Sequence, residues 1–216
     1  MRVLAGMALL SALALGSGTA IRAQDIAAGG VAGVNLSTLS VDDSEISDMD
    51  FRTGFNFGAR FSAAITPNLG LMLEVLYAQK GAKVTEGDAA VTFQFDYLEF
   101  PVLARYEAVT DLEGKVKAHG AVGGVLGFQV GCRLRAESGG VQVGVGCDEI
   151  GVETKGADLG LMFLGGFEIA AGPGAVLLDF AYNHGLLNVN AASGEGSIKN
   201  RTLYLQAGYK IALGAI

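Results

Sequence analysis

The stretch Phe55-Asn56-Phe57-Gly58-Ala59-Arg60-Phe61-Ser62-Ala63-Ala64-Ile65 repeats with a period of two residues. Its odd-numbered positions are apolar, whereas its even-numbered positions are small or polar. Successive side chains of a β-strand point to opposite faces of a sheet. The pattern therefore predicts a strand with one apolar face and one polar face.

The same rhythm recurs down to the C-terminus and predicts eight strands, at about 27–38, 53–65, 70–80, 91–106, 116–130, 157–170, 175–187 and 201–213. The gaps between them alternate: they are long at 39–52, 81–90, 131–156 and 188–200, and short at 66–69, 107–115 and 171–174. The short gaps around Pro67 and Pro173 contain residues typical of tight turns. Long loops at one end and tight turns at the other predict an all-β, eight-stranded antiparallel up-and-down barrel, closed between its first and last strands.

The polar face of these strands distinguishes a membrane barrel from a water-soluble one. In a soluble barrel that face would meet water and carry many Lys, Glu and Thr residues. Here it carries mostly small residues, including Gly54, Gly58, Ser62, Ala64, Ala121, Gly123 and Gly127. The opposite face carries large apolar residues, including Phe55, Phe57, Phe61, Leu71, Leu73, Val75, Tyr77, Leu161, Phe163, Phe167, Leu178, Phe180, Leu203 and Leu205. The pattern favours a transmembrane barrel with its apolar face toward lipid, and a secreted lipocalin-like binding barrel is the alternative.

Residues 1–23 have the features of a secretory signal peptide: Arg2, an apolar stretch over 3–15, and small residues before a cleavage point after Ala20 or Ala23. The apolar stretch is shorter than the ~20 residues of a spanning helix. We therefore expect residues 24–216 to form one barrel domain in the bacterial outer membrane. Apolar residues make up 50% of the chain and charged residues only 17%, and the net charge of −7 argues against a nucleic-acid partner.

The expected fourth strand contains a change of phase. Phe93, Phe95 and Tyr97 are apolar at odd positions, whereas Leu98 and Phe100 are apolar at even positions. A shift of one residue is what a β-bulge produces, so a bulge is predicted near Tyr97.

At these strands the chain resembles the PorT-like outer-membrane β-barrel proteins, in segments 33–37, 73–81, 97–106, 185–188 and 199–203. The resemblance implies an eight-stranded outer-membrane barrel and implies little about activity. In the last strand, Gln206, Gly208, Ile211 and Leu213 resemble the insertion signal that the barrel-assembly machinery reads, although the chain ends in Ile216 and not in an aromatic residue. The assembly machinery and outer-membrane lipid are therefore the expected partners.

The sequence also predicts a disulfide in one of the long gaps and a network of charges on the inward face of the strands. Cys132 and Cys147 are the only cysteines, and in an exported chain they predict one disulfide in the long gap 131–156. A turn centred on Pro67 places Arg60 opposite Glu74 on the inward face. The other inward charges complete an expected lumen network, with Glu99, Arg105 and Asp179 inside and Lys117, Glu168 and Lys210 nearer the periplasmic mouth.

Little in the chain indicates catalysis. His119 falls on an inward position and His184 at the outer rim, and neither has an adjacent nucleophile in the sequence, so no enzymatic activity and no cofactor are expected. The acidic residues of 41–50 lack the spacing of a known calcium loop, and a solvated acidic loop is the favoured reading over a calcium site.

An eight-stranded barrel is just wide enough for its interior side chains to fill it. The predicted function is therefore that of a monomeric structural or recognition barrel that contacts an extracellular or periplasmic partner through its loops. A narrow or gated conduit, or an accessory to a secretion system, is the alternative.

Overall fold

The computed structural model describes residues 26–41, 50–109, 115–151, 156–189 and 197–213. The strands are β1 (Ile26–Val41), β2 (Asp50–Ala64), β3 (Leu69–Glu86), β4 (Ala89–Val109), β5 (Val116–Ser138), β6 (Val141–Gly146), β7 (Ala157–Ala171), β8 (Gly174–Gly185) and β9 (Ile198–Ala212). A short 3-10 helix, η3 (Asp148–Ile150), follows β6. Within these ranges, no helix has both the length and the apolar character needed to cross a membrane.

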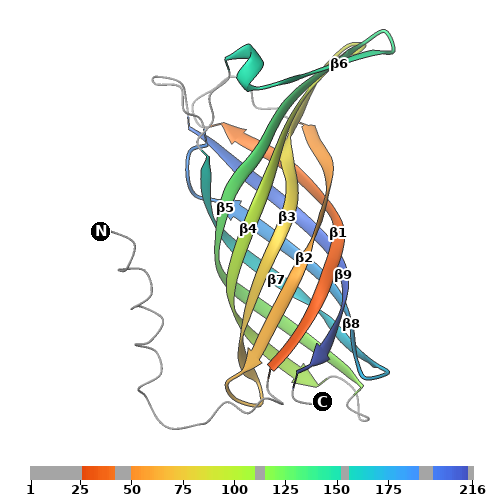
Figure 1. Cartoon of the computed structure of the whole chain (residues 1–216), viewed down its shortest axis with the longest axis vertical. Helices are drawn as coiled ribbons and strands as arrows, with labels where there is room; N and C mark the ends of the chain where they lie inside the picture. The colour runs from red at the N-terminus through yellow and green to blue at the C-terminus, as the bar shows by residue number, and fades with distance from the viewer. Residues whose placement is uncertain (1–25, 42–49, 110–114, 152–155, 190–196, 214–216) are drawn as a thin grey trace, which may run out of the picture.

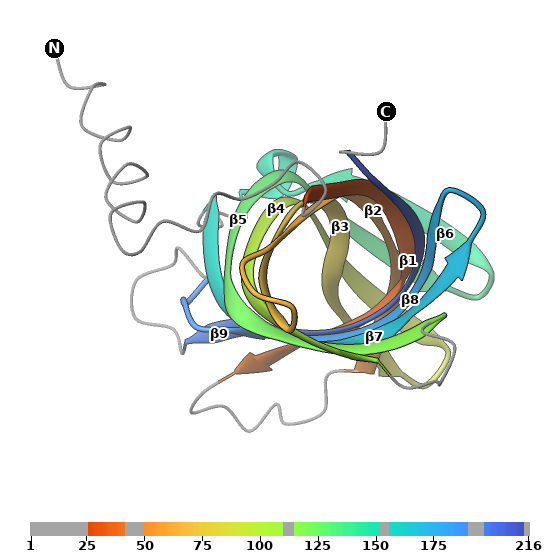
Figure 2. The ribbon, with the colours of Figure 1, turned by 90° about the horizontal axis from the view of Figure 1, so that it is seen from below.

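Eight of the strands close into a ring in the order β1-β2-β3-β4-β5-β7-β8-β9, and each strand is antiparallel to its neighbours (Figure 2). The ring closes where β1 pairs with β9, in a register that runs from Ala27 opposite Ala212 to Val41 opposite Ile198. The predicted eight-stranded up-and-down barrel and its seam between the first and last strands are therefore confirmed. The expected signal peptide, residues 1–23, lies outside the described residues.

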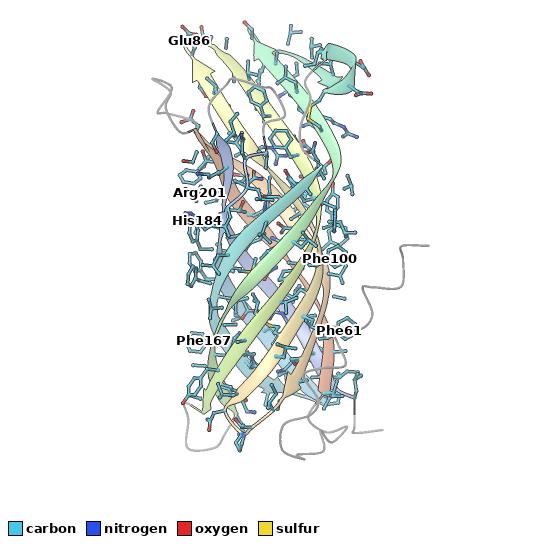
Figure 3. The ribbon with its side chains drawn as sticks, turned by 90° about the vertical axis from the view of Figure 1, so that its left-hand side faces the viewer. Phe61, Glu86, Phe100, Phe167, His184 and Arg201 are labelled. Carbon is cyan, nitrogen blue, oxygen red and sulfur yellow. A yellow bond between two sulfur atoms is a disulfide. The ribbon has the colours of Figure 1, made fainter. Side chains whose placement is uncertain are left out.

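Large apolar side chains cover the outside of the wall. Phe57, Phe163 and Phe180 are each 50% exposed. Side chains of this size and apolar character are usually buried in a soluble protein. Figure 3 shows the same outward placement for Phe61, Phe100 and Phe167. A lipocalin-like barrel would carry such residues inside, so the soluble alternative is wrong and the outward face is the one that meets lipid.

Three strands continue beyond the ring at the extracellular end. The upper parts of β3, β4 and β5, together with β6, which pairs with β5, form a sheet that stands above the rest of the wall (Figure 1). We call this part, with β3 from Gly81, β4 to Phe95, β5 from Gly131 and all of β6, the extracellular sheet. At its base, Ala82 and Lys83 of β3 still pair with Phe51 and Asp50 of β2.

The prediction of long loops at 81–90 and 131–156 was therefore wrong for most of their length, because β3, β4, β5 and β6 occupy it. Tight turns explain the difference: only Gly87-Asp88 separates β3 from β4, and only Gly139-Gly140 separates β5 from β6. Gly87, Gly139 and Gly140 have φ values of 57°, 57° and 80°, which two-residue hairpin turns require and glycine adopts at low cost.

The predicted bulge in the fourth strand is also wrong. The β3–β4 register is regular from Leu69 opposite Tyr106 to Glu86 opposite Ala89. Tyr97 is fully buried and lies on the inward face, in phase with Glu99. The irregularity is instead on β5, because Asp96 pairs with Gly131 while Tyr97 pairs with Gln129. Aromatic residues on both faces of β4 produced the apparent change of phase.

Candidate functional site

The middle of the lumen contains an ion-paired cluster built on Arg60. From β2, its Nε contacts Glu74 Oε1 on β3, and its Nη1 contacts Asp179 Oδ2 on β8. The side chains are 3%, 0% and 1% exposed. The turn at 65–68 sets residue 60 opposite residue 74, which is the register expected from Pro67. Asp179, on the distant strand β8, completes the cluster. No local sequence pattern indicated that it would pair with Arg60.

His119 extends this cluster toward the periplasm. Its Nε2 lies 2.9 Å from Asp179 Oδ1, and both side chains are buried. Gly166 on β7 lies opposite Asp179, and a Cβ atom there would collide with the Asp179 carboxylate and the Leu178 carbonyl. The histidine therefore belongs to the lumen network and has a structural neighbour, as its inward position suggested.

A second cluster lies nearer the extracellular end. Lys80 Nζ is 2.5 Å from Glu99 Oε1, and Tyr204 Oη donates a 2.8 Å hydrogen bond to Glu99 Oε2. Lys80 also lies 5.2 Å from the centre of the Tyr97 ring. Above it, Asn200 donates to Asp158 at 2.8 Å. Lys80 was absent from the expected network, although its position in phase with Glu74 on β3 was a sufficient signal.

A third cluster surrounds the periplasmic mouth. Arg105 Nη2 lies 2.5 Å from Glu168 and 2.6 Å from Glu107, while Lys210 and Lys117 pair with Glu168 and Glu107 at 2.5 Å and 2.6 Å. These residues line a cavity of about 630 Å³ that also includes the turn at 65–68. The five residues expected in the network thus divide among three layers, and Arg105 does not contact Arg60 or Glu99.

Apolar side chains fill space between these layers. Met72, Leu103, Met162 and Tyr204 are at most 1% exposed and belong to one packed cluster inside the ring. The lumen therefore contains alternating layers of charged and apolar side chains. Buried charges persist when they are paired, and Arg60, Glu74, Asp179, Lys80 and Glu99 each form an ion pair inside the ring.

The extracellular sheet carries the disulfide. Cys132 on β5 and Cys147 after β6 are bonded, with their Cα atoms 5.5 Å apart. The bond fixes the end of β6 to β5 at the base of the hairpin, directly beside the pair Arg133 and Gly146. In the described part of the chain β6 pairs with β5 alone, so its other edge is open, and Val141 and Val143 are 66% and 59% exposed.

No catalytic constellation is visible in the described ranges. His184 lies on the outer surface beside Arg201 and Tyr182, and neither is a nucleophile activated by a neighbouring base (Figure 3). No group of three or more His, Cys, Asp or Glu in these ranges is placed to hold a metal ion. Most of the acidic segment 41–50 lies outside the described residues.

The residues of the expected insertion signal all lie on β9 or just after it. Gln206 is buried and accepts from Arg60 Nη2 at 3.4 Å, whereas Ile211 and Leu213 are 41% and 43% exposed on the outer surface. Gly208 pairs with Val31 on β1 at the seam. This alternation is that of a regular barrel strand.

The outer membrane protein beta-barrel domain is the family whose model matches this chain, over residues 22–190. Neisserial surface protein A (NspA) is similar in structure, with a TM-score of 0.51, 17% identity, and coverage of 87% of this chain and 97% of that one. Ail of Yersinia pestis aligns at 16% identity over 86% and 98% of the two chains, with a TM-score of 0.43. No curated protein matches the sequence.

At these identities the likeness to NspA extends to the fold alone, but the family match covers most of the chain. That match agrees with the closed ring, the apolar outer face and the charged lumen. The chain therefore belongs to the outer membrane protein beta-barrel domain family and is an integral β-barrel of the bacterial outer membrane.

Proposed function

We propose that this protein is a non-enzymatic recognition barrel that holds a rigid extracellular sheet at the cell surface. The observation that carries the proposal is the extracellular sheet itself. It stands above the lipid-facing wall, is fixed by the Cys132–Cys147 disulfide, and ends in β6, whose outer edge pairs with no other strand of the described residues. An unguarded strand edge is a ready template for pairing with another chain.

The residues of β6 support this role. The strand Val141-Gln142-Val143-Gly144-Val145-Gly146 carries no charge and no proline, the two features that natural proteins most often use to block edge pairing. Its backbone donors and acceptors on the open side would pair with an extended segment of a partner protein. NspA is described as a surface protein, which is consistent with this proposal.

The lumen supports a closed barrel over a conduit. The three charge layers and the apolar cluster between them occupy the cross-section of an eight-stranded ring, whose interior is just wide enough for side chains. A gated conduit or secretion accessory is the second candidate, favoured by the 630 Å³ cavity at the periplasmic mouth. We further propose export through residues 1–23, assembly through the β9 signal, and membership of the PorT-like branch.

Planar-bilayer recording of the purified protein tests the lumen. We expect no conductance steps from the wild-type protein or from Glu137→Gln, a control on the extracellular sheet. Discrete steps in the wild-type protein would replace the recognition proposal with the conduit.

Photo-crosslinking on living cells tests the sheet. A photoreactive residue at Val143 should yield discrete protein adducts, whereas the same residue at the lipid-facing Phe167 should yield none. Equal protein adducts at both positions, or none at Val143, would contradict recognition through β6.

A further inference from the structure

The outer face of β1, β8 and β9 changes from apolar to polar within one row of the sheet, and this row contains the cation Arg201. The pairing registers define three successive rows toward the extracellular side: Val34, Leu205 and Phe180; then Leu36, Leu203 and Tyr182; then Thr38, Arg201 and His184. Val34, Leu205 and Phe180 are 50%, 55% and 50% exposed, as expected of residues in lipid. Arg201 and His184 therefore lie where the apolar belt ends, high on the outer wall (Figure 3).

A cavity of about 410 Å³ lies at this boundary, and we call it the rim pocket. Its lining combines three kinds of group: the rings of Phe51 and Tyr182 with Leu203, the hydroxyl residues Thr38 and Ser40, and the guanidinium of Arg201. Below it the wall continues as apolar surface. A site of this composition fits an amphiphile whose anionic headgroup lies above its hydrocarbon chain.

The side chain that contacts Arg201 does not neutralise the positive charge of its guanidinium. Arg201 Nη1 lies 2.5 Å from His184 Nδ1. Arginine can only donate, so Nδ1 accepts and the imidazole proton resides on Nε2, which becomes a further donor. No carboxylate of the described residues forms an ion pair with Arg201.

We propose that the rim pocket binds one phosphate group of a phosphorylated glycolipid in the outer leaflet. Arg201 lines the pocket and supplies a planar fork of donors that matches phosphate oxygens. His184 is not among the lining residues, and it holds the Arg201 guanidinium in position through Nδ1. The acyl chains of the lipid would lie along Leu203, Leu205 and Phe180. This site faces the membrane and is independent of the extracellular sheet, so the two proposals can fail separately.

Native mass spectrometry of the refolded full-length protein tests the site with diphosphoryl lipid A as the probe. We expect one retained lipid on the wild-type protein and about tenfold weaker retention by Arg201→Gln, because a charge-assisted hydrogen bond to phosphate is lost. Arg201→Lys should recover only part of the loss, because lysine lacks the fork. Arg135→Gln, which removes an exposed cation from the extracellular sheet, is the matched control and should bind as the wild-type protein does.

Three comparisons separate a phosphate site from other causes. Dephosphorylated lipid A should bind the wild-type protein as weakly as lipid A binds Arg201→Gln, and equal binding of both lipids would overturn the proposal. Equal losses in Arg201→Gln and Arg135→Gln would show general attraction to an anionic surface and would also overturn it. If millimolar inorganic phosphate raises the unfolding temperature of the wild-type protein as much as lipid A does, the site takes a free anion and the lipid assignment is wrong.

Discussion

At the scale of single residues, Arg60 joins two fully buried carboxylates in the middle of the lumen. Its removal would strand Glu74 and Asp179 together inside the ring, whereas removal of Glu74 leaves Arg60 paired with Asp179. We therefore predict that Arg60→Ala lowers the free energy of unfolding in urea by about 3–5 kcal/mol, the usual cost of breaking a buried pair. Glu74→Ala should cost distinctly less.

The double variant distinguishes a contact from two separate effects. Arg60→Ala with Glu74→Ala should recover part of the loss, because one stranded carboxylate is gone while Asp179 keeps His119 as a neighbour. Glu137→Ala, an exposed carboxylate on the extracellular sheet, should change stability by less than about 0.5 kcal/mol. Strictly additive losses for Arg60 and Glu74 would show that the two residues are not coupled.

At the scale of elements, the disulfide should stabilise the extracellular sheet and leave the ring alone. Cys132 and Cys147 are 15 positions apart, and closing a loop of that size is worth about 3 kcal/mol in the chain-entropy model. We predict that changing both cysteines to serine leaves heat-modifiable gel mobility and the urea midpoint of the barrel unchanged. Protease added to intact cells should instead cleave near Gly139 and Gly140 much faster. Unaltered cleavage would contradict a restraining role.

The strands and their local register could be predicted from the sequence, whereas contacts between distant strands could not. Alternation located all eight ring strands, and a short turn was enough to pair Arg60 with Glu74, because register near a tight turn is a local property. The partners Asp179 and Tyr204 depend on pairings between distant strands, which no local pattern reports. The sequence did not predict the extracellular sheet, because the glycines of its tight turns are also typical of loops. The predicted change of phase in β4 was wrong because aromatic residues such as Phe95 and Tyr97 lie on the inward face.

At the scale of the whole molecule, closure of the ring should be required for insertion. A protein that ends at Asn200 lacks nearly all of β9 and leaves β1 and β8 with open edges in lipid, where unpaired backbone groups are very costly. We predict that it is absent from the outer membrane. A protein that ends at Leu213 keeps every strand and Gln206, Gly208, Ile211 and Leu213, and it should assemble. Normal outer-membrane levels of the shorter protein would contradict the closed-ring requirement.

The contacts of Arg60 also bear on the seam between β1 and β9. Arg60 on β2 reaches Asp179 on β8, and Gln206 on β9 donates to Asn56 on β2 at 2.8 Å. These bonds cross the seam from inside, so β1 and β9 cannot part unless buried charges separate. We therefore do not expect the barrel to open sideways for a lipid or a substrate. In the recognition proposal, the protein therefore acts through its outer surfaces and not through its wall.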